Sequence, residues 1–299
     1  MKNSALRADA MLIIVALIWG SGFVAQRSAM DHIGPFTFTT LRYLIGAAVL
    51  VPFVLRSKRP RFSKPVLIHG IFLGLIMTVA ATLQQVGLVY TTASRAAFIT
   101  GLYVLVVPAI GFCFGQRSTL GHILGVLLAG IGIYFLAGDL SGEFGRGDTL
   151  VALCALAWGF HVVFVAKLAP DSDPILLALI QFVTVAVVAL AIQLFTESPT
   201  IESIANAKWS ILYSGIFAVG LGFTLQIIAQ RKAPVTHAAI LMSFETVFGA
   251  FFGWLLINER LSPIEIFGCS LMLCGIVLSQ LWPHKPTPAE QTKLIDPVR

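Results

Sequence analysis

Charged side chains are scarce in this chain. Asp, Glu, Lys and Arg make up 11% of its 299 residues, whereas 57% of the residues are hydrophobic. A domain surrounded by water needs a polar surface, and a single core could not hide so much apolar material. A water-soluble fold is therefore excluded, and the solvent of this protein must be the lipid bilayer.

Cysteine is also scarce, and motifs for nucleotide binding or for an ion filter are missing. The four cysteines, at positions 113, 154, 269 and 274, lie in apolar runs without a CxxC pair or a histidine at metal spacing, and we interpret them as buried small hydrophobes. The sequence thus predicts no metal and no other cofactor. A GxxxxGK[ST] loop is absent, which argues against an ATP-driven pump. A channel is not favoured either, because the sequence contains neither a ring of like charges nor a carbonyl filter motif.

Long apolar segments dominate the chain instead. About 20 residues cross the hydrocarbon core as a helix, and segments of that length follow one another with short connections that leave no room for an extramembrane domain. The sequence predicts an all-α polytopic membrane protein with ten transmembrane helices. The expected helices are approximately Ala10–Ala29, Phe36–Leu55, Val66–Val86, Ala96–Gly115, Leu120–Ala137, Thr149–Leu168, Ile175–Phe195, Trp209–Ala229, Thr236–Ile257 and Pro263–Trp282.

The distribution of Lys and Arg predicts the orientation of these helices, because cytoplasmic loops retain basic residues preferentially. With the N-terminus inside, fourteen basic residues fall on the cytoplasmic side and five on the opposite side, while Arg42 lies within the second segment. We therefore expect a multi-pass protein of the inner (plasma) membrane with both termini in the cytoplasm. The net charge of +6 is then a topology signal rather than a sign of nucleic-acid binding.

The two halves of the sequence resemble each other. Ala16–Gly20, with its Trp-Gly pair, recurs 139 residues later as Ala155–Gly159, and at the same offset Pro35 falls on Pro174. An odd number of crossings per copy forces the second copy to start on the opposite face. The sequence therefore predicts inverted repeats, a common device of secondary transporters, with the substrate site near the midplane between them.

The expected domain organisation follows from this repeat. It comprises a first five-helix repeat over residues 1–138, a periplasmic linker over 139–148, a second five-helix repeat over 149–282 and a cytoplasmic tail over 283–299. Other positions match between the halves, some with a slightly different offset. They include Arg42 with Gln181, Ser94 with Thr236, Gly125 with Gly268, and Gly132 with Gly275.

Several motifs resemble the EamA family of the drug/metabolite transporter superfamily. They are the AxxWG opening of both halves, the run Thr92–Phe98, and above all FETVFGAFFGWLLINERLSPIEIFG at Phe244–Gly268. The resemblance spans roughly Met11 to Leu281 and implies ten helices around a central cavity, with export of amino acids, other metabolites or drugs. The first half has Gln116 and Arg117 where the family usually has Glu-Arg, so a role for that acid does not carry over.

Glu245 is the main candidate for a functional residue. It lies about ten residues into the ninth segment, roughly 15 Å deep at 1.5 Å per residue. Ionisable groups at that depth are costly and mark substrate or proton pathways. A purely structural carboxyl, hydrogen-bonded between helices, is the alternative.

Arg42 is the second charged candidate, and its repeat mate Gln181 is neutral. The guanidinium could bind an anionic solute or pair with Glu245. A long side chain roughly 9 Å from a helix end can also snorkel to the interface, and we favour snorkelling or a structural pair.

Further candidates for substrate binding or coupling are Trp19, Trp158, His161, Gln181, Gln84 and Gln85, with Pro108 as a gating candidate. The two Trp residues lie away from the interfacial belts, which favours a cavity lining, although packing between helices fits equally well. His161 could relay protons or be a hydrogen-bonded core histidine. Pro108 should kink its helix, either as a gate or as a static bend.

The alternative function is an intramembrane serine-type enzyme, in which Ser21 would be activated by His161. A three-residue GxG match is common in Gly-rich helices, so this remains the weaker hypothesis. The sequence favours a secondary transporter that moves a small organic solute by alternating access. It does not indicate the substrate, the direction of transport, the coupling ion or the oligomeric state.

Overall fold

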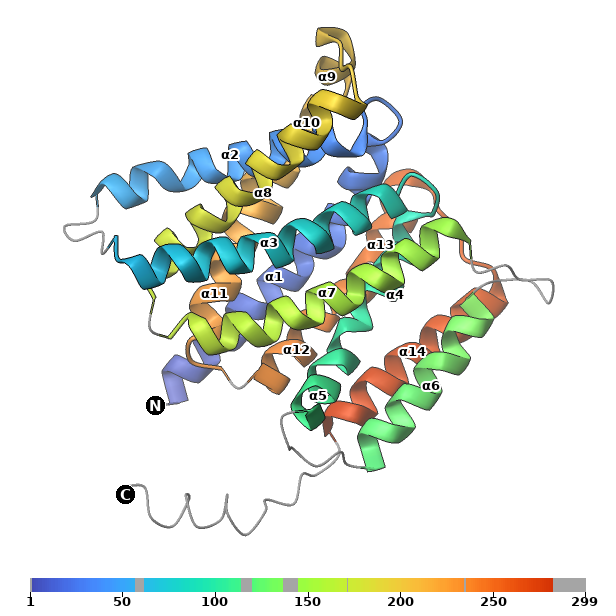
Figure 1. Cartoon of the computed structure of the whole chain (residues 1–299). Coiled ribbons are helices and arrows are strands. Elements are labelled where there is room, and N and C mark those ends of the chain that lie inside the picture. Colours follow the sequence, from blue (N-terminus) through green and yellow to red (C-terminus); the bar gives the residue numbers. More distant parts are fainter. Residues whose placement is uncertain are drawn as a thin grey trace, which may run out of the picture.

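The computed structural model describes residues 2–56, 62–113, 120–136, 145–170, 172–233 and 235–281, and every regular element in them is a helix (Figure 1). The helices are α1 (Lys2–Ala29), α2 (Pro35–Arg56), α3 (Lys64–Gly87), α4 (Ala93–Gly101), α5 (Tyr103–Cys113), α6 (Leu120–Leu136), α7 (Arg146–Leu168), α8 (Pro174–Thr196), α9 (Ile201–Asn206), α10 (Lys208–Tyr213), the π-helix η1 (Ser214–Phe223), α11 (Thr224–Gln230), α12 (Val235–Ser243), α13 (Glu245–Ile257) and α14 (Pro263–Leu281).

Helices lie at all ten segments that the sequence predicts. By length and composition, seven of the helices in the described part of the chain could cross a membrane. The helices at the fifth, ninth and tenth predicted segments are apolar but shorter. The helical, membrane-compatible fold agrees with the sequence, whereas the count of ten crossings stays a prediction.

Three predicted segments are interrupted. A single turn at Leu102 separates α4 from α5, and another at Phe244 separates α12 from α13. The eighth segment runs through α10, η1 and α11, so a π-helix of 10 residues occupies its middle. A π-helix within a longer helix is rare and occurs frequently at functional sites.

The order of packing has a two-fold pattern. α1 packs against α13 and α10–α11, and its counterpart α7 packs against α4, α5 and α3. α2 packs on η1, as α8 packs on α3. Helices that correspond between the halves also pack on each other, α2 on α8 and α6 on α14. Figure 1 shows α6 and α14 as a pair beside the other helices. This is the pattern that two related halves would produce.

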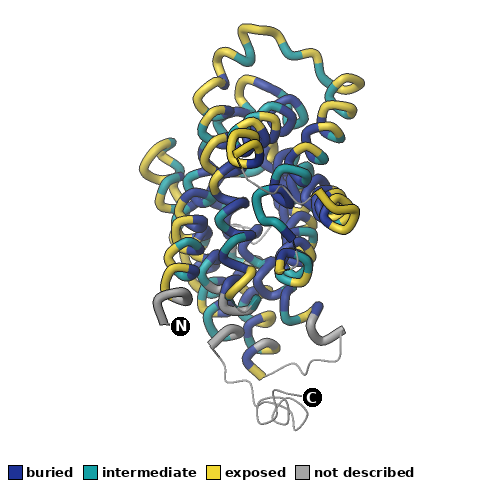
Figure 2. Tube along the Cα trace, turned by 90° about the vertical axis from the view of Figure 1, so that its left-hand side faces the viewer, coloured by how far each residue is buried: buried dark blue, intermediate teal, exposed yellow. Residues whose placement is uncertain are grey.

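Buried residues face the interior of the bundle and exposed ones its outside (Figure 2). The exposed side chains include many large hydrophobics, such as Phe53, Leu75 and Val187. An apolar exterior suits lipid, where it carries no penalty. Two cysteines, Cys154 and Cys269, are buried as expected, whereas Cys274 is exposed because it lies on the outer face of α14.

Glycines bring α6 and α14 into backbone contact. An added Cβ at Gly132 would lie 2.6 Å from the carbonyl oxygen of Gly268, and one at Gly275 would lie 2.6 Å from that of Gly125. These are the four glycines that the internal repeat relates to one another. Small residues let helices approach this closely in lipid.

Gly132→Ala should therefore destabilise the α6–α14 pair, because its methyl group meets backbone that must move. We expect a loss of about 1–3 kcal/mol in the free energy of unfolding, typical of overpacking. Gly130→Ala, on the same helix, is the matched control, since a Cβ there meets nothing within 4 Å. Thermal unfolding in detergent measures both, and equal midpoints would show that the contact is not tight.

Candidate functional site

A small cavity, in which the centre of a water molecule can occupy about 50 Å³, lies between the helices of the two halves. Its walls come from α1, α2, α3, α4, α5, α7, η1, α11 and α13. The lining residues are Trp19, Phe23, Gln26, Arg42, Tyr43, Gln84, Thr100, Tyr103, Trp158, Val162, Ala218, Val219, Phe223, Gln226 and Glu245. The cavity is thus mostly apolar and aromatic, with a few polar groups, which is the usual character of a small-molecule site.

Glu245 reaches this cavity as the first residue of α13, directly after the turn at Phe244. Its side chain is 3% exposed, and its Oε1 atom has no hydrogen-bond partner within the described residues. A buried carboxyl oxygen without a partner is expensive. At Oε1 the structure therefore does not show the hydrogen bond between helices that the structural alternative proposes.

Tyr103 occupies the equivalent place in the first half. It begins α5 after the turn at Leu102, and it precedes Glu245 by 142 residues, the offset that relates Ser94 to Thr236. Its hydroxyl is also buried without a partner in the described part of the chain. Two broken helices thus point a polar group each into one cavity. Nothing in the sequence pattern marks Tyr103, since the break that positions it is invisible there.

Arg42 lines the same cavity and is 4% exposed, so it does not snorkel to the interface. Its Nη1 atom donates a hydrogen bond to Oε1 of Gln26 over 2.5 Å. The guanidinium carbon also lies 5.2 Å from the ring centroid of Phe38 and 5.1 Å from that of Tyr43. No ion pair joins Arg42 to Glu245 among the described residues, so the structure does not contain the pair that the sequence left open.

Aromatic rings form another wall. The ring of Phe223 lies 4.8 Å from that of Trp19 and 5.4 Å, nearly parallel, from that of Trp158, measured between centroids. The two Trp residues predicted from the repeat therefore meet through an aromatic residue that was not predicted. All three line the cavity and offer flat apolar surfaces to a solute.

The π-helix η1 holds one of these rings in place. Nε1 of Trp19 donates to the backbone carbonyl of Ala218, in the middle of η1, over 3.1 Å. Gly222 must lack a side chain here, because a Cβ would lie 2.6 Å from that nitrogen. The glycines of η1 are the only sequence signal for this close approach, and glycines are frequent throughout the chain.

The other predicted residues divide between the cavity and the packing around it. Gln84 lines the cavity and donates to the hydroxyl of Thr100 over 3.2 Å. Gln85 instead donates to the backbone carbonyl of Gln26, outside the lining. His161 and Gln181 form a buried hydrogen bond of 2.8 Å and do not line the cavity either.

Pro108 lies within α5, whereas the interruption of this segment comes at Leu102. The gating candidate is therefore not where the helix breaks. The serine dyad is not formed either, because Ser21 Oγ bonds to the carbonyls of Leu17 and Ile18 and to the hydroxyl of Tyr213. The presumed base, His161, is occupied by Gln181.

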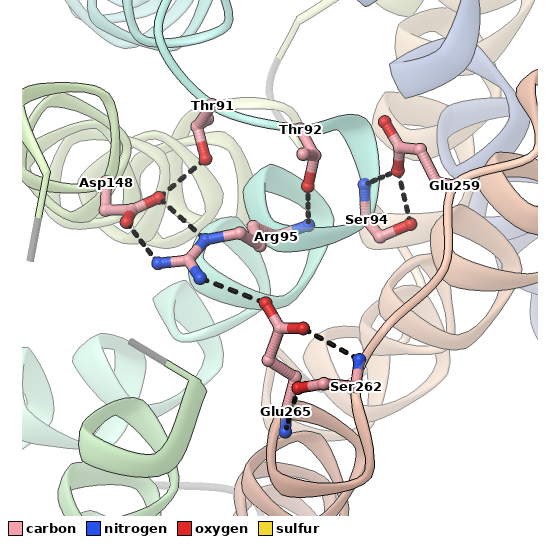
Figure 3. A network of polar contacts seen from close by, with 8 residues as sticks. All are labelled: Thr91, Thr92, Ser94, Arg95, Asp148, Glu259, Ser262 and Glu265. Atoms are coloured by element: carbon pink, nitrogen blue, oxygen red, sulfur yellow. Dashed lines mark hydrogen bonds and ion pairs between the residues drawn. The ribbon is translucent and has the colours of Figure 1, made fainter. Parts of the chain in front are cut away.

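A polar cluster joins the halves at the end of the bundle where α2, α4, α7 and α14 begin (Figure 3). Arg95 of α4 forms ion pairs with Asp148 of α7 over 2.5 Å and with Glu265 of α14 over 3.1 Å. Thr91 donates to Asp148, and the backbone of Ser262 donates to Glu265. We call these five residues the Arg95 network.

Two carboxylates from the second half cap helices of the first half at this same end. Glu259 accepts hydrogen bonds from the backbone of Ala93 and Ser94 at the start of α4, both at 2.8 Å. Glu197 accepts from the backbone of Phe36 and Thr37 at the start of α2. Negative charge at a helix N-terminus is favourable, because the first N–H groups lack partners within the helix.

Comparison with known proteins gives the family. The profile of the EamA-like transporter family matches twice, over residues 6–138 and 145–281. An uncharacterized transporter of Archaeoglobus fulgidus is 34% identical over 281 residues, covering 92% of this chain and 86% of that protein. The threonine/homoserine exporter RhtA of Escherichia coli K12 is 24% identical, covering 94% of this chain and 93% of RhtA.

A solved crystal structure shares the fold, with a TM-score of 0.70 at 21% identity, covering 92% of this chain and 96% of that one. The names of the relatives point to transporters rather than enzymes. The resemblance seen in the motifs is thereby confirmed. The chain belongs to the EamA-like transporter family of multi-pass membrane proteins.

Proposed function

We propose that this protein is a secondary exporter of small organic solutes, such as amino acids, other metabolites or drugs. The observation that carries the proposal is the cavity between the halves, into which Arg42 and Glu245 both project without pairing. Sites near the midplane between repeats are typical of such transporters. The exporter name of RhtA supports the direction of transport.

The proposed mechanism is alternating access by two inverted five-helix halves, residues 1–138 and 149–282, joined by the linker 139–148. The two separate matches of the family profile and the two-fold packing pattern support this division. The Arg95 network and the caps from Glu197 and Glu259 hold the halves together at one end. Their release would open the cavity to that side.

Glu245 is proposed to couple transport to protons, because it is the buried acid that faces the cavity. Arg42, Trp19, Trp158 and Gln84 are proposed to contact the solute. Gln85, Gln181 and His161 pack behind these residues and are proposed to position them. Pro108 remains a proposed hinge within α5, about 1.7 turns beyond the break at Leu102.

The protein is proposed to reside in the inner membrane with both termini and the tail 283–299 in the cytoplasm, which makes the Arg95 network periplasmic. The fourteen-to-five asymmetry of basic residues supports this topology. Fused after Arg299, a reporter that works only in the cytoplasm should be active, and a reporter that works only in the periplasm should be inactive. Activity of a periplasmic reporter at that site would contradict the even number of crossings.

Transport by the purified protein tests the proposed function. The protein is reconstituted into liposomes loaded with radiolabelled threonine, homoserine or one of a panel of other amino acids and small amphiphiles, and efflux is followed with and without a pH gradient. We expect efflux of at least one solute from liposomes that contain the protein and not from protein-free liposomes loaded with the same solute. If no solute leaves faster than from protein-free liposomes, the proposal fails.

A further inference from the structure

We propose that Arg42 and Gln26 form the binding site for a carboxylate group of the transported solute. The inference rests on the proposed function and adds a chemical class to it. It starts from a buried guanidinium for which the described residues supply no anion. In the structure its hydrogen-bond acceptor is a neutral amide, and the contacts around it are aromatic rings.

A buried cation without an anion is costly, and charged groups inside membrane proteins usually pair with one another. Aromatic faces and one amide compensate only part of that cost. The three ion pairs in the described part of the chain involve Arg27 and Arg95, and none lies at the cavity. The missing anion is therefore assigned to the solute, which enters a cavity that Arg42 already lines.

The arrangement leaves the guanidinium ready for a carboxylate. Arginine carries five N–H donors in a fork that matches two carboxylate oxygens. One donor nitrogen, Nη1, binds Gln26, while Nε is buried without a partner. Gln26 is itself fixed, because its Nε2 atom donates to the carbonyl of Gly22 and its own backbone carbonyl accepts from Gln85. Its Oε1 atom thus orients the fork.

The internal repeat argues that the charge is not needed for folding. At the equivalent point of the second half stands the neutral Gln181, which is satisfied by His161. The first half could be packed in the same way. Of these two equivalent positions, only the one whose side chain reaches the cavity carries a positive charge.

The charge of the lining selects a carboxylate over a phosphate. Arg42 is the one Lys or Arg among the lining residues that the structure describes, and Glu245 is the one acid. A phosphate ester carries up to two negative charges and would leave excess negative charge beside that acid. A single carboxylate balances a single guanidinium, and the Trp19, Trp158 and Phe223 rings suit an apolar remainder.

The first experiment compares solutes that share an apolar part and differ in whether they carry a carboxylate, an ammonium group or both, using purified wild-type protein in nanodiscs. One set is phenylalanine, 3-phenylpropionate and 2-phenylethylamine, and a second is leucine, 4-methylpentanoate and 3-methylbutylamine. Binding is read from the rise in Tm with ligand concentration. We expect the carboxylate-bearing members of at least one set to bind, and the amine of that set to bind at least about tenfold more weakly.

Either of two results overturns the inference: amines that bind as tightly as the carboxylates, or no binding in both sets. The liposome assay separates these failures from failure of the proposed function. Transport of an amine or an uncharged solute would leave the transporter proposal standing while the carboxylate site is rejected. Absence of all transport would reject the transporter proposal itself.

The second experiment gives Arg42 an internal anion. Gln26→Glu places a carboxylate where Oε1 of the amide lies 2.5 Å from Nη1, so it should occupy the site that the solute needs. The new charge pair with Arg42 offsets the hydrogen bond from Nε2 to the carbonyl of Gly22 that the variant loses, so we expect a Tm close to that of the wild type. The affinity for carboxylates should fall by about thirtyfold or more. This variant avoids Arg42→Gln, which removes the cation and could prevent folding.

Gln226→Glu is the matched control, since it adds the same charge to the same cavity from α11, at a residue that has no hydrogen bond to Arg42. Its effect on carboxylate affinity should be several-fold smaller. Equal losses in the two variants would mean that net charge alone decides binding, and the Arg42 site would be rejected. A Gln26→Glu protein with wild-type affinity for the carboxylates would reject it as well.

Discussion

Glu245→Gln should abolish proton-driven accumulation of the solute while the protein folds and still exchanges solute across the membrane. The amide has the shape of the protonated carboxyl but cannot release a proton. Glu245 lies 3% exposed in the cavity, and its Oε1 atom has no partner within the described residues that the amide would lose. With one proton per solute, a gradient of one pH unit supports about a tenfold concentration ratio, and that ratio should fall to one.

Two measurements in liposomes are compared. One is accumulation of the solute under a pH gradient, and the other is exchange of internal for external labelled solute. Glu202→Gln, an exposed substitution on α9, is the control for the loss of one carboxylate and should behave as wild type. If Glu245 serves only structure, Tm or abundance should fall before transport does. Normal abundance together with normal pH-driven accumulation in Glu245→Gln would exclude a coupling role.

Hydrophobicity was sufficient to place the helices, because in lipid the length of an apolar run directly sets the length of a helix. The interruptions at Leu102 and Phe244 had no such signal. Both are ordinary apolar residues, and they lie where α4 packs against α13, with Gly101 so close to Thr246 that a Cβ would meet its side chain. Contacts between distant parts of the chain decide such breaks, and local sequence does not contain them.

Position along a helix could likewise be predicted, but direction around the helix could not. Glu245 was singled out because charge at its predicted depth is costly, and Arg42 because its repeat mate is neutral, and both reach the cavity. His161 was placed at a similar depth, yet it faces Gln181. Phe223 is one apolar residue among many until the π-helix turns it toward the two Trp rings.

Arg95→Gln should open the end of the transporter that we propose to face the periplasm. The side chain is 16% exposed and binds two carboxylates from different helices, Asp148 and Glu265. Its loss leaves these two negative charges close together and without this cation. Breaking a buried pair by removing one partner costs about 3–5 kcal/mol while the charges stay buried. Opening that end to water relieves the cost, so the balance of states should shift toward the outward-open one.

Labelling from outside detects this shift. A single cysteine at position 84, introduced after the native cysteines are replaced, lies on the cavity wall toward the outer end of α3. A membrane-impermeant thiol reagent added to intact cells should modify it at least about tenfold faster in Arg95→Gln, which corresponds to a shift of about 1.4 kcal/mol. The Tm should also fall.

Arg27→Gln is the matched control, because it breaks an exposed pair with Asp31 in which the two side chains are 31% and 61% exposed. Such pairs contribute about 0–1 kcal/mol, so labelling and Tm should barely change. A triple variant, Arg95→Gln with Asp148→Asn and Glu265→Gln, removes the charge imbalance and should recover most of the Tm that Arg95→Gln loses. If Arg95→Gln labels no faster than Arg27→Gln, the network does not hold this end closed, and the barrier must lie in the caps from Glu197 and Glu259 or in the packing between α4 and α13.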